Sequence, residues 1–261
     1  MARMSSTEEF RRFAEDVADC ARRMSLPSFR GDIEVSLKDD ASPVTAVDRN
    51  VEAMVCERIR STYPQHGILG EEHGPSHIDA EYVWSIDPID GTRSFITGWP
   101  LWGTLLALLR HGRPILGLID MPVLGERWIG VSGGNTELNG RRCRSRPACP
   151  LSAATLYTTS PDAFTADELV RFERVSRAAR GRRFGGDCYS YALLAAGHID
   201  AVIEANLKPY DYLALAPVIE AAGGVITDWH GRPLDMRSGS QVVAAASTQL
   251  HREIVALLAA S

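Results

Sequence analysis

The stretch WSIDPIDGT, residues 84–92, decides how this chain of 261 residues is understood. An apolar run ends at Asp87, a second carboxylate follows at Asp90, and a proline stiffens the turn between them. Two hard oxygen ligands at this spacing suit Mg²⁺, which proteins hold with a few carboxylates, water and substrate phosphate. If a helix begins here, the backbone N–H groups of Gly91 and Thr92 form an anion cradle. A solvated acidic turn would show the same D-x-x-D spacing, so the stretch needs support from elsewhere in the chain.

Three other acidic residues stand where structural elements end or begin. Glu71 follows the apolar run 67–70, and Asp48 and Asp211 each come just before a segment with helical spacing. An acid in front of a helix can also be a simple N-cap. Each position alone is therefore uninformative, but together with the two aspartates of residues 84–92 they indicate a metal site.

Apolar periodicity predicts helices that alternate with sheets. The expected helices cover residues 6–24, 48–63, 165–179, 189–197 and 212–222 and the C-terminus, and the expected strands cover 67–70, 82–86, a meander from 101 to 139, 154–159, 201–204, 225–227 and 242–246. This order predicts an α+β fold with αβαβα layers. The basic stretch 141–150 suggests an N-terminal half, residues 1–145, with most candidate metal ligands. A C-terminal half, residues 146–261, would carry Asp211 and the substrate-recognition residues within one compact unit.

Composition argues against several classes of protein. The formal net charge is −5 with no long run of either sign, which disfavours nucleic acid as the main ligand. The five cysteines are scattered without a C-x-x-C pair, so a reducing compartment fits better than a disulfide framework or structural zinc site. Residues 1–13 lack the apolar core of a signal peptide, and the longest apolar stretch, 101–109, is too short to span a bilayer. We therefore expect a cytoplasmic protein with no membrane or nucleic-acid partner.

At this point the sequence resembles the inositol monophosphatase-like phosphatases, a lithium-sensitive, Mg²⁺-dependent family. The matching motifs are Asp87-Pro-Ile-Asp90-Gly-Thr92, Gly70-Glu71-Glu72, Lys38-Asp-Asp followed by Pro43-Val-Thr-x-x-Asp48, and Asp211 followed by Glu220-Ala-Ala-Gly-Gly. The resemblance runs from about residue 8 to residue 258 and departs at Tyr210, where the family usually has Trp. It implies the layered αβαβα sandwich of the inositol monophosphatase and sugar phosphatase type, and a homodimer.

The resemblance also implies a ligand set for the metals. Glu71, Asp87 and the Ile89 carbonyl would bind the first ion, and Asp87, Asp90 and Asp211 would bind the second. Glu71 could also contribute to the binding of a third ion. Two or three Mg²⁺ ions, with Mn²⁺ as a substitute, would reverse the negative charge of these carboxylates. An acidic protein could then attract a phosphate monoester, the expected small-molecule partner.

Further roles implied by the resemblance concern the water and the phosphate. Thr92, oriented by Asp48, would position and activate the attacking water, with Glu71 as the third catalytic residue. The amides of Gly91 and Thr92 would hold the phosphate. Lys38 would lie in a loop near the site, although a surface lysine fits the sequence equally well.

The segment 182–191, RRFGGDCYSY, is similar to the histidinol-phosphatase branch of the family, as is the run 197–211. Histidinol carries an ammonium and an imidazole, which acceptors such as Asp187 and Glu204 suit. Asp187 could instead be the cap of the following helix. Arg182 and Arg183 are the only candidates here for a basic pocket, and Arg183 is the third candidate substrate-binding residue.

Three functions follow from these patterns. The first is hydrolysis of histidinol phosphate to histidinol and phosphate, a step of histidine biosynthesis. The second is hydrolysis of inositol 1-phosphate or another small alcohol monophosphate. The third, from a different class, is an RNA-machinery binding regulator of the same fold. The complete set of acidic residues and the lack of a basic stripe argue against this regulator.

Overall fold

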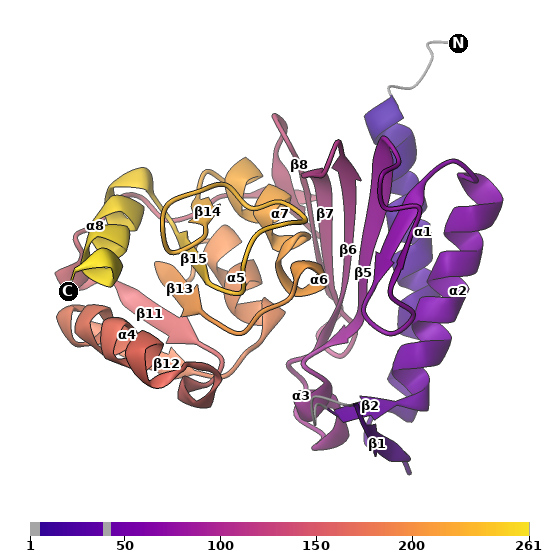
Figure 1. The fold of residues 1–261 in the computed structure, drawn as a ribbon, viewed down its shortest axis with the longest axis horizontal. Coiled ribbons are helices and arrows are strands. Elements are labelled where there is room, and N and C mark those ends of the chain that lie inside the picture. The colour runs from indigo at the N-terminus through magenta and orange to yellow at the C-terminus, as the bar shows by residue number, and fades with distance from the viewer. Residues whose placement is uncertain (1–5, 39–42, 261) are drawn as a thin grey trace.

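The computed structural model describes residues 6–38 and 43–260, so the two aspartates that follow Lys38 lie outside the described residues. Five layers are stacked side by side (Figure 1). They are helices α1 (Ser6–Ser25) and α2 (Ala46–Thr62), an eight-stranded sheet, helices α5 to α7, a five-stranded sheet, and helices α4 (Ala166–Ala178) and α8 (Thr248–Ala259). The predicted α+β fold with αβαβα layers is confirmed.

The larger sheet carries the stretch that opened the sequence analysis. Its strand order is β10-β9-β8-β7-β6-β5-β3-β4. The strands are β3 (Gly67–Gly70), β4 (Pro75–Ser76), β5 (Tyr82–Asp90), β6 (Gly103–Arg110), β7 (Arg113–Met121), β8 (Glu126–Val131), β9 (Thr136–Leu138) and β10 (Arg141–Cys143). Strands β6 to β9 form the expected antiparallel meander, and β10 extends it into the stretch 141–150 that was expected to be a boundary. Strand β5 runs parallel to β3 and continues through the D-x-x-D stretch instead of ending before it.

The smaller sheet has the order β12-β11-β13-β15-β14. Its strands are β11 (Thr155–Thr158), β12 (Gly181–Phe184), β13 (Ala201–Glu204), β14 (Val225–Thr227) and β15 (Val242–Ala245). Strand β12 was not expected, because its sequence GRRF has no apolar alternation and all four residues are exposed. Its pairing with β11, which is parallel, makes it an edge strand.

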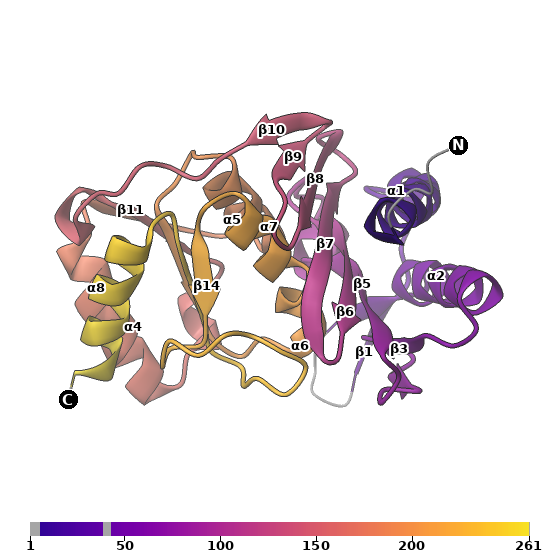
Figure 2. The same ribbon diagram turned by 90° about the horizontal axis from the view of Figure 1, so that it is seen from above.

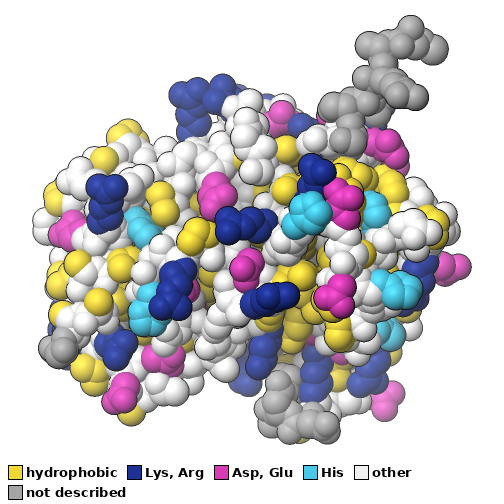
Figure 3. Space-filling model, turned by 45° about the horizontal axis from the view of Figure 1, so that its top comes forward, with side chains coloured by type: hydrophobic (Ala, Val, Ile, Leu, Met, Phe, Trp, Pro, Cys, Tyr) yellow, Lys and Arg dark blue, Asp and Glu magenta, His cyan; other side chains and the backbone are white. Residues whose placement is uncertain are grey.

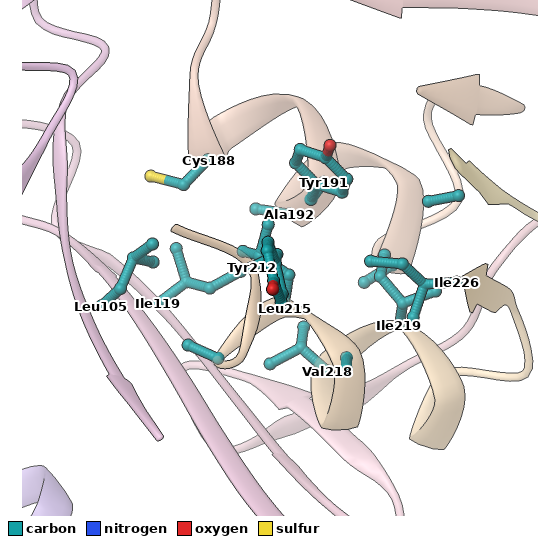
Figure 4. Packing of buried hydrophobic residues seen from close by; sticks show 14 of the residues in the cluster. Leu105, Ile119, Cys188, Tyr191, Ala192, Tyr212, Leu215, Val218, Ile219 and Ile226 are labelled. Carbon is teal, nitrogen blue, oxygen red and sulfur yellow. The ribbon is translucent and has the colours of Figure 1, made fainter. Parts of the chain in front are cut away.

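The middle layer consists of α5 (Cys188–Ala195), α6 (Pro209–Tyr212) and α7 (Leu215–Ala221). A single helix over 212–222 was expected, and this expectation was wrong because the chain breaks into two helices between Tyr212 and Leu215. Leu105 and Ile119 of the larger sheet face the apolar side chains of this layer (Figure 4). Glycine at position 117 permits close packing, since a Cβ there would lie 1.9 Å from the carbonyl oxygen of Ala214.

The two sheets come from different parts of the chain. The larger one uses residues 67–143 and the smaller one residues 155–245. An extended segment links them along one side of the molecule, as Figure 2 shows between β10 and β11. The division into units 1–145 and 146–261 stays a prediction. No helix of the described residues is long and apolar enough to cross a membrane.

Two short strands and four short helical segments complete the fold. Strands β1 (Val35–Leu37) and β2 (Pro43–Thr45) form a small antiparallel hairpin next to α2. Helix α3 (Thr92–Ile96) follows β5 directly. Three single turns of 3₁₀-helix, η1 (Leu26–Ser28), η2 (Leu151–Ala153) and η3 (Pro161–Ala163), lie in connections.

Candidate active site

The candidate site lies where the parallel strands β3 and β5 end at the same edge of the larger sheet. Glu71 directly follows β3, and Asp87 and Asp90 lie on either side of an irregularity in β5, where its register with β6 shifts. Asp211 arrives from α6 in the second half of the chain. Carboxylate oxygens of Asp87, Asp90 and Asp211 all lie within 4.8 Å of one another. The structure thus brings together acids that are 124 positions apart in the sequence (211 − 87).

The carboxylates resist ionisation in the absence of a cation. Burial, followed by the charges of Glu71, Asp90 and Asp211, raises the pKa of Asp87 well above its ordinary value. Burial and the neighbouring Asp187 and Asp211 do the same to the pKa of Asp90. Burial raises the pKa of Asp211 to about 8. Carboxylates that are buried and close to one another favour their neutral, protonated form unless a positive charge is present.

The oxygen atoms at the centre of the cluster fit a divalent cation. The Oδ1 atom of Asp87 is buried and has no hydrogen-bond partner among the described residues. The backbone N–H groups of Cys188 and Lys208 donate to Oδ2 of Asp90 at 2.6 Å and Oδ2 of Asp211 at 2.7 Å, which fixes both side chains. A buried oxygen without a hydrogen-bond partner lowers the stability of the fold. A set of ligands that are all oxygen atoms suits Mg²⁺. Asp87, Asp90 and Asp211, with Glu71 beside them, could therefore hold metal ions.

Lys38 is a neighbour of the site and not a remote surface residue. Its Nζ lies 2.7 Å from Oε1 of Glu71 and 2.6 Å from Oε1 of Glu72. Both carboxylates raise the pKa of Lys38 despite the opposing effect of burial. A protein cation thus balances part of the negative charge at this edge.

Thr92 begins helix α3 next to a buried carboxylate. Its hydroxyl oxygen lies 3.0 Å from the Ile89 carbonyl oxygen and 3.4 Å from Oδ1 of Asp48. Asp48 is not the N-cap of α2, which is Thr45; instead its Oδ2 accepts the Thr45 N–H at 2.9 Å, as the second member of a capping box. Burial raises the pKa of Asp48. Gly91 precedes the helix with φ at 85°, a conformation that favours glycine.

A cavity of about 430 Å³ extends from this cluster to the second half of the chain. Asp187 lines it, and its Oδ2 accepts a hydrogen bond of 3.0 Å from the hydroxyl of Ser94. Its backbone has φ at 45°, and its side chain makes no capping bond to α5. Asp187 therefore occupies the N-cap position of α5, but its side chain does not act as the cap. Burial raises the pKa of this carboxyl.

Glu204 is the second acidic residue on the far wall of the cavity, at the end of β13. It is 5% exposed and accepts hydrogen bonds from the Tyr191 hydroxyl at 2.9 Å and the Thr159 N–H at 2.9 Å. The Thr159 hydroxyl also donates to it. Burial raises its pKa. These bonds fix the carboxylate and leave little of its acceptor capacity for a ligand.

The structure does not bring Arg183 to this site. Arg183 lies exposed on the edge strand β12 and is not among the residues that line the cavity. Arg182 is also directed elsewhere, because it pairs with Glu173 at 2.6 Å. The sequence offered no way to see this, since the strand that displaces both arginines has no apolar pattern.

Several residues that line or support the cavity were not identified as candidate site residues from the sequence. Among the described lining residues, Arg93 is the one Lys, Arg or His, and Asp162 adds an exposed carboxylate from η3. Ser94 orients Asp187, and Tyr191, which lies in the segment 182–191 singled out in the sequence, orients Glu204. The signal for Arg93 and Ser94 was their position directly after the D-x-x-D-G-T stretch, on the same short helix.

Comparison with known proteins decides the family. The model of the inositol monophosphatase family matches residues 6–261. The chain belongs to the inositol monophosphatase family. An inositol monophosphatase from Zymomonas mobilis has a structure that superposes with a TM-score of 0.90 at 41% sequence identity, over 98% of this chain and 99% of that one. The family comprises phosphatases that generally depend on Mg²⁺, act on small phosphate monoesters and are often oligomeric.

Curated relatives of the chain carry different names. A bifunctional phosphatase, IMPL2, described as chloroplastic, from Arabidopsis thaliana is 46% identical over 95% of this chain and 75% of that protein. A histidinol-phosphatase from Chlorobaculum parvum is 33% identical over 94% of this chain and 95% of that protein. The Nus factor SuhB of Salmonella typhimurium is also 33% identical, over 80% of each chain. Relatives at this level of identity show the phosphatase family but do not identify the alcohol part of the substrate.

Proposed function

We propose that this phosphatase hydrolyses histidinol phosphate to histidinol and phosphate. The observation that carries the proposal is the second acidic wall of the cavity, where Asp187 and Glu204 face a space that also borders the carboxylate cluster. Histidinol presents an ammonium and an imidazole, both of which donate hydrogen bonds. A carboxylate is the strongest acceptor for such donors. The histidinol-phosphatase among the relatives supports the same choice.

Metal binding is assigned to the carboxylate cluster. Asp87, Asp90, Asp211 and Glu71, with the Ile89 carbonyl, would hold two or three Mg²⁺ ions, for which Mn²⁺ would substitute. Bound Mg²⁺ supplies positive charge that lowers the pKa of water and stabilises charge on the phosphate and the leaving oxygen. The orphaned Oδ1 of Asp87 is the atom that most needs such a partner.

The remaining chemistry is assigned to protein groups around Thr92. Its hydroxyl proton can be donated to the Ile89 carbonyl or to Asp48, since both are acceptors within reach. The hydroxyl oxygen then has lone pairs free to accept a hydrogen bond from a water and to hold that water in line with the phosphate. The N–H groups of Gly91 and Thr92 would donate to the phosphate oxygens. Glu71 would share in orienting the attacking water.

The alcohol is assigned to the far wall. Asp187 would accept a hydrogen bond from a cationic nitrogen, and Ser94 holds its carboxylate in place with a 3.0 Å hydrogen bond. Glu204 would contribute mainly through its negative charge, because Tyr191 and Thr159 already use most of its acceptor sites. Arg183 is withdrawn from the proposed substrate site because it does not line the cavity.

Two alternatives rest on relatives and not on the cavity wall. Inositol 1-phosphate or another small alcohol phosphate is favoured by the 41% identity to the Zymomonas mobilis inositol monophosphatase. A role in binding RNA machinery is suggested by the Nus factor relative. On the face shown in Figure 3, Lys and Arg side chains are interspersed with Asp and Glu and do not form a basic stripe. Together with the formal net charge of −5, this face supports our proposal that the chain has no nucleic-acid partner.

Assembly and compartment are proposals as well. We propose a homodimer, since members of the family are often oligomeric. A cytoplasmic location is supported by five cysteines that are all free in the structure, as in a reducing compartment.

The proposed substrate is tested by measuring phosphate release from histidinol phosphate and from inositol 1-phosphate under the same Mg²⁺ concentration. We expect kcat/KM to be at least about tenfold higher for histidinol phosphate, which corresponds to one charged hydrogen bond. Equal values, or a preference for the inositol ester, would move the assignment to the alternative.

A further inference from the structure

Glu52 is a buried carboxylate directly behind the candidate active site. It lies on α2, one helical turn after Asp48, and its side chain is 0% exposed. It does not line the cavity, and among the described residues it has no Lys or Arg partner. A charge-bearing side chain in such a place is expected to serve a purpose, because burying a carboxylate without a permanently charged partner is costly.

The two oxygens of Glu52 bind the backbone that follows strand β3. The N–H of Glu72 donates to Oε2 at 2.8 Å, and the N–H of His73 donates to Oε1 at 2.7 Å. The Nδ1 atom of His73 lies 2.9 Å from the same Oε1 and donates to it when it carries the proton. One side chain therefore fixes two successive amides of the turn that carries Glu71.

The sequence of this turn is adapted to the carboxylate. A Cβ on Gly70 would lie 2.2 Å from Oε1 of Glu52, so only glycine lets the end of β3 approach the carboxylate this closely. The turn has few other backbone restraints: the N–H of Gly70 donates to Gly74 at 3.2 Å, and the N–H of Glu71 donates to Ile86 at 3.2 Å. Both of these bonds are longer than those made by Glu52.

We propose that Glu52 is a positioning residue that holds the Glu71–Glu72 turn in the shape needed to bind the metal cation. Its carboxylate would act through the backbone and would touch neither the substrate nor the ion. Glu71 then reaches the cluster around Asp87 with its direction already fixed. This inference rests on the proposed function, because it takes Glu71 as a ligand.

Two substitutions separate position from charge. Glu52→Gln keeps the size of the side chain but replaces one acceptor with a donor, which cannot bind an amide N–H. Glu52→Asp keeps the buried charge but is one methylene shorter, so its oxygens cannot reach both amides. Glu57→Gln, an exposed position on the same helix, is the matched control.

The measurement is the melting temperature of EDTA-treated protein during titration with MgCl₂, which reports binding without turnover. We expect both Glu52 variants to need about 10- to 100-fold more Mg²⁺ than the wild type to reach half of the thermal shift, as for other groups that orient metal ligands. Phosphate release at saturating Mg²⁺ should recover to within about threefold of wild type, because the ligand itself remains. Glu57→Gln should match the wild type in both measurements.

Other outcomes contradict the proposal in distinct ways. A lower melting temperature with an unchanged Mg²⁺ midpoint would make Glu52 a purely structural residue. A weakened midpoint in Glu52→Gln alone would show that the charge matters and the position does not. If Glu52→Gln does not fold, Glu52→Asp carries the same comparison. A wild-type protein with no Mg²⁺-dependent shift would refute the proposed metal site itself, independently of Glu52.

Discussion

The carboxylate of Asp90 accepts a hydrogen bond of 2.6 Å from the backbone N–H of Cys188. Asp90 ends strand β5 of the larger sheet, and Cys188 begins helix α5 of the middle layer. This bond therefore connects two walls of the cavity that come from different parts of the chain. It also supplies the capping acceptor that Asp187, the residue just before the helix, does not provide. Asp187 is thereby free to bind Ser94 and to line the cavity.

Substitution of Asp90 tests the assignment of the metal ligands. In Asp90→Asn the side-chain oxygen can still accept the Cys188 N–H, but the charge is lost. We expect turnover at saturating Mg²⁺ to fall below about a tenth of wild type, and Glu71→Gln to behave alike. The fold should persist, and the metal-free protein should be slightly more stable because carboxylate repulsion is relieved. Asp16→Asn, exposed on α1, is the control. Turnover above that level in either site variant would remove the residue from the ligand set.

The hydroxyl of Thr92 is tested by a change that keeps the shape of the side chain. Thr92→Val removes the group that lies 3.0 Å from the Ile89 carbonyl oxygen. If this group orients water in the transition state, kcat should fall while KM changes little. Thr92→Ser, which retains the hydroxyl, should restore most of kcat. An unchanged kcat in the valine variant would reduce Thr92 to a helix-start residue.

The raised pKa of Asp211 predicts a pH-dependent stability of the metal-free protein. Folded Asp211 has a pKa of about 8, against an ordinary value of 3.8. Between these values the folded protein retains a proton that the unfolded chain has lost, so stability falls as the pH rises toward 8. Asp211→Asn cannot titrate, and its stability relative to wild type should therefore increase from pH 5 to pH 8 in EDTA.

Chemical denaturation at several pH values measures this difference. In the wild type, the stabilisation produced by Mg²⁺ should be larger at pH 8 than at pH 6, because the cation binds the ionised carboxylates. Parallel stability curves for wild type and Asp211→Asn would contradict the raised pKa.

Substrate recognition is tested separately from chemistry at Asp187. A charged hydrogen bond is worth about 1.5–3 kcal/mol, so Asp187→Asn should lower kcat/KM for histidinol phosphate by roughly ten- to 150-fold. Hydrolysis of p-nitrophenyl phosphate, which has no cationic nitrogen, should hardly change. Ser94→Ala is a matched control, because it removes the 3.0 Å hydrogen bond from Ser94 to Asp187 but keeps the carboxylate. It should lower kcat/KM for histidinol phosphate less than Asp187→Asn does. Equal losses on both substrates would remove the physical reason for choosing histidinol phosphate.

Some of this site could be predicted because the deciding information is local. Glu71 and Asp87 follow or lie in strands whose apolar runs are evident in the sequence, and parallel neighbours end at the same edge of a sheet. The convergence of Asp87, Asp90 and Asp211 within 4.8 Å agrees with the expected cluster. Their role as ligands stays a prediction.

Other features depend on contacts between distant parts of the chain. Whether the side chain of Asp187 caps α5 depends on Asp90, which is 97 positions away (187 − 90) and accepts the Cys188 N–H. Arg183 is displaced by strand β12, which exists because β11 offers it an edge and not because of its own sequence. The contact between Glu52 and the turn after Gly70 likewise requires α2 to pack behind β3. Local sequence patterns carry no information about these long-range contacts.

The central claim is that a carboxylate-held cation is required for phosphate-ester hydrolysis. The most direct test is phosphate release from histidinol phosphate by protein that has been exhaustively treated with EDTA, before and after metal is returned. We expect no activity after chelation and full recovery with Mg²⁺ or Mn²⁺, because every proposed ligand is an oxygen atom. Full activity after exhaustive chelation would contradict the account.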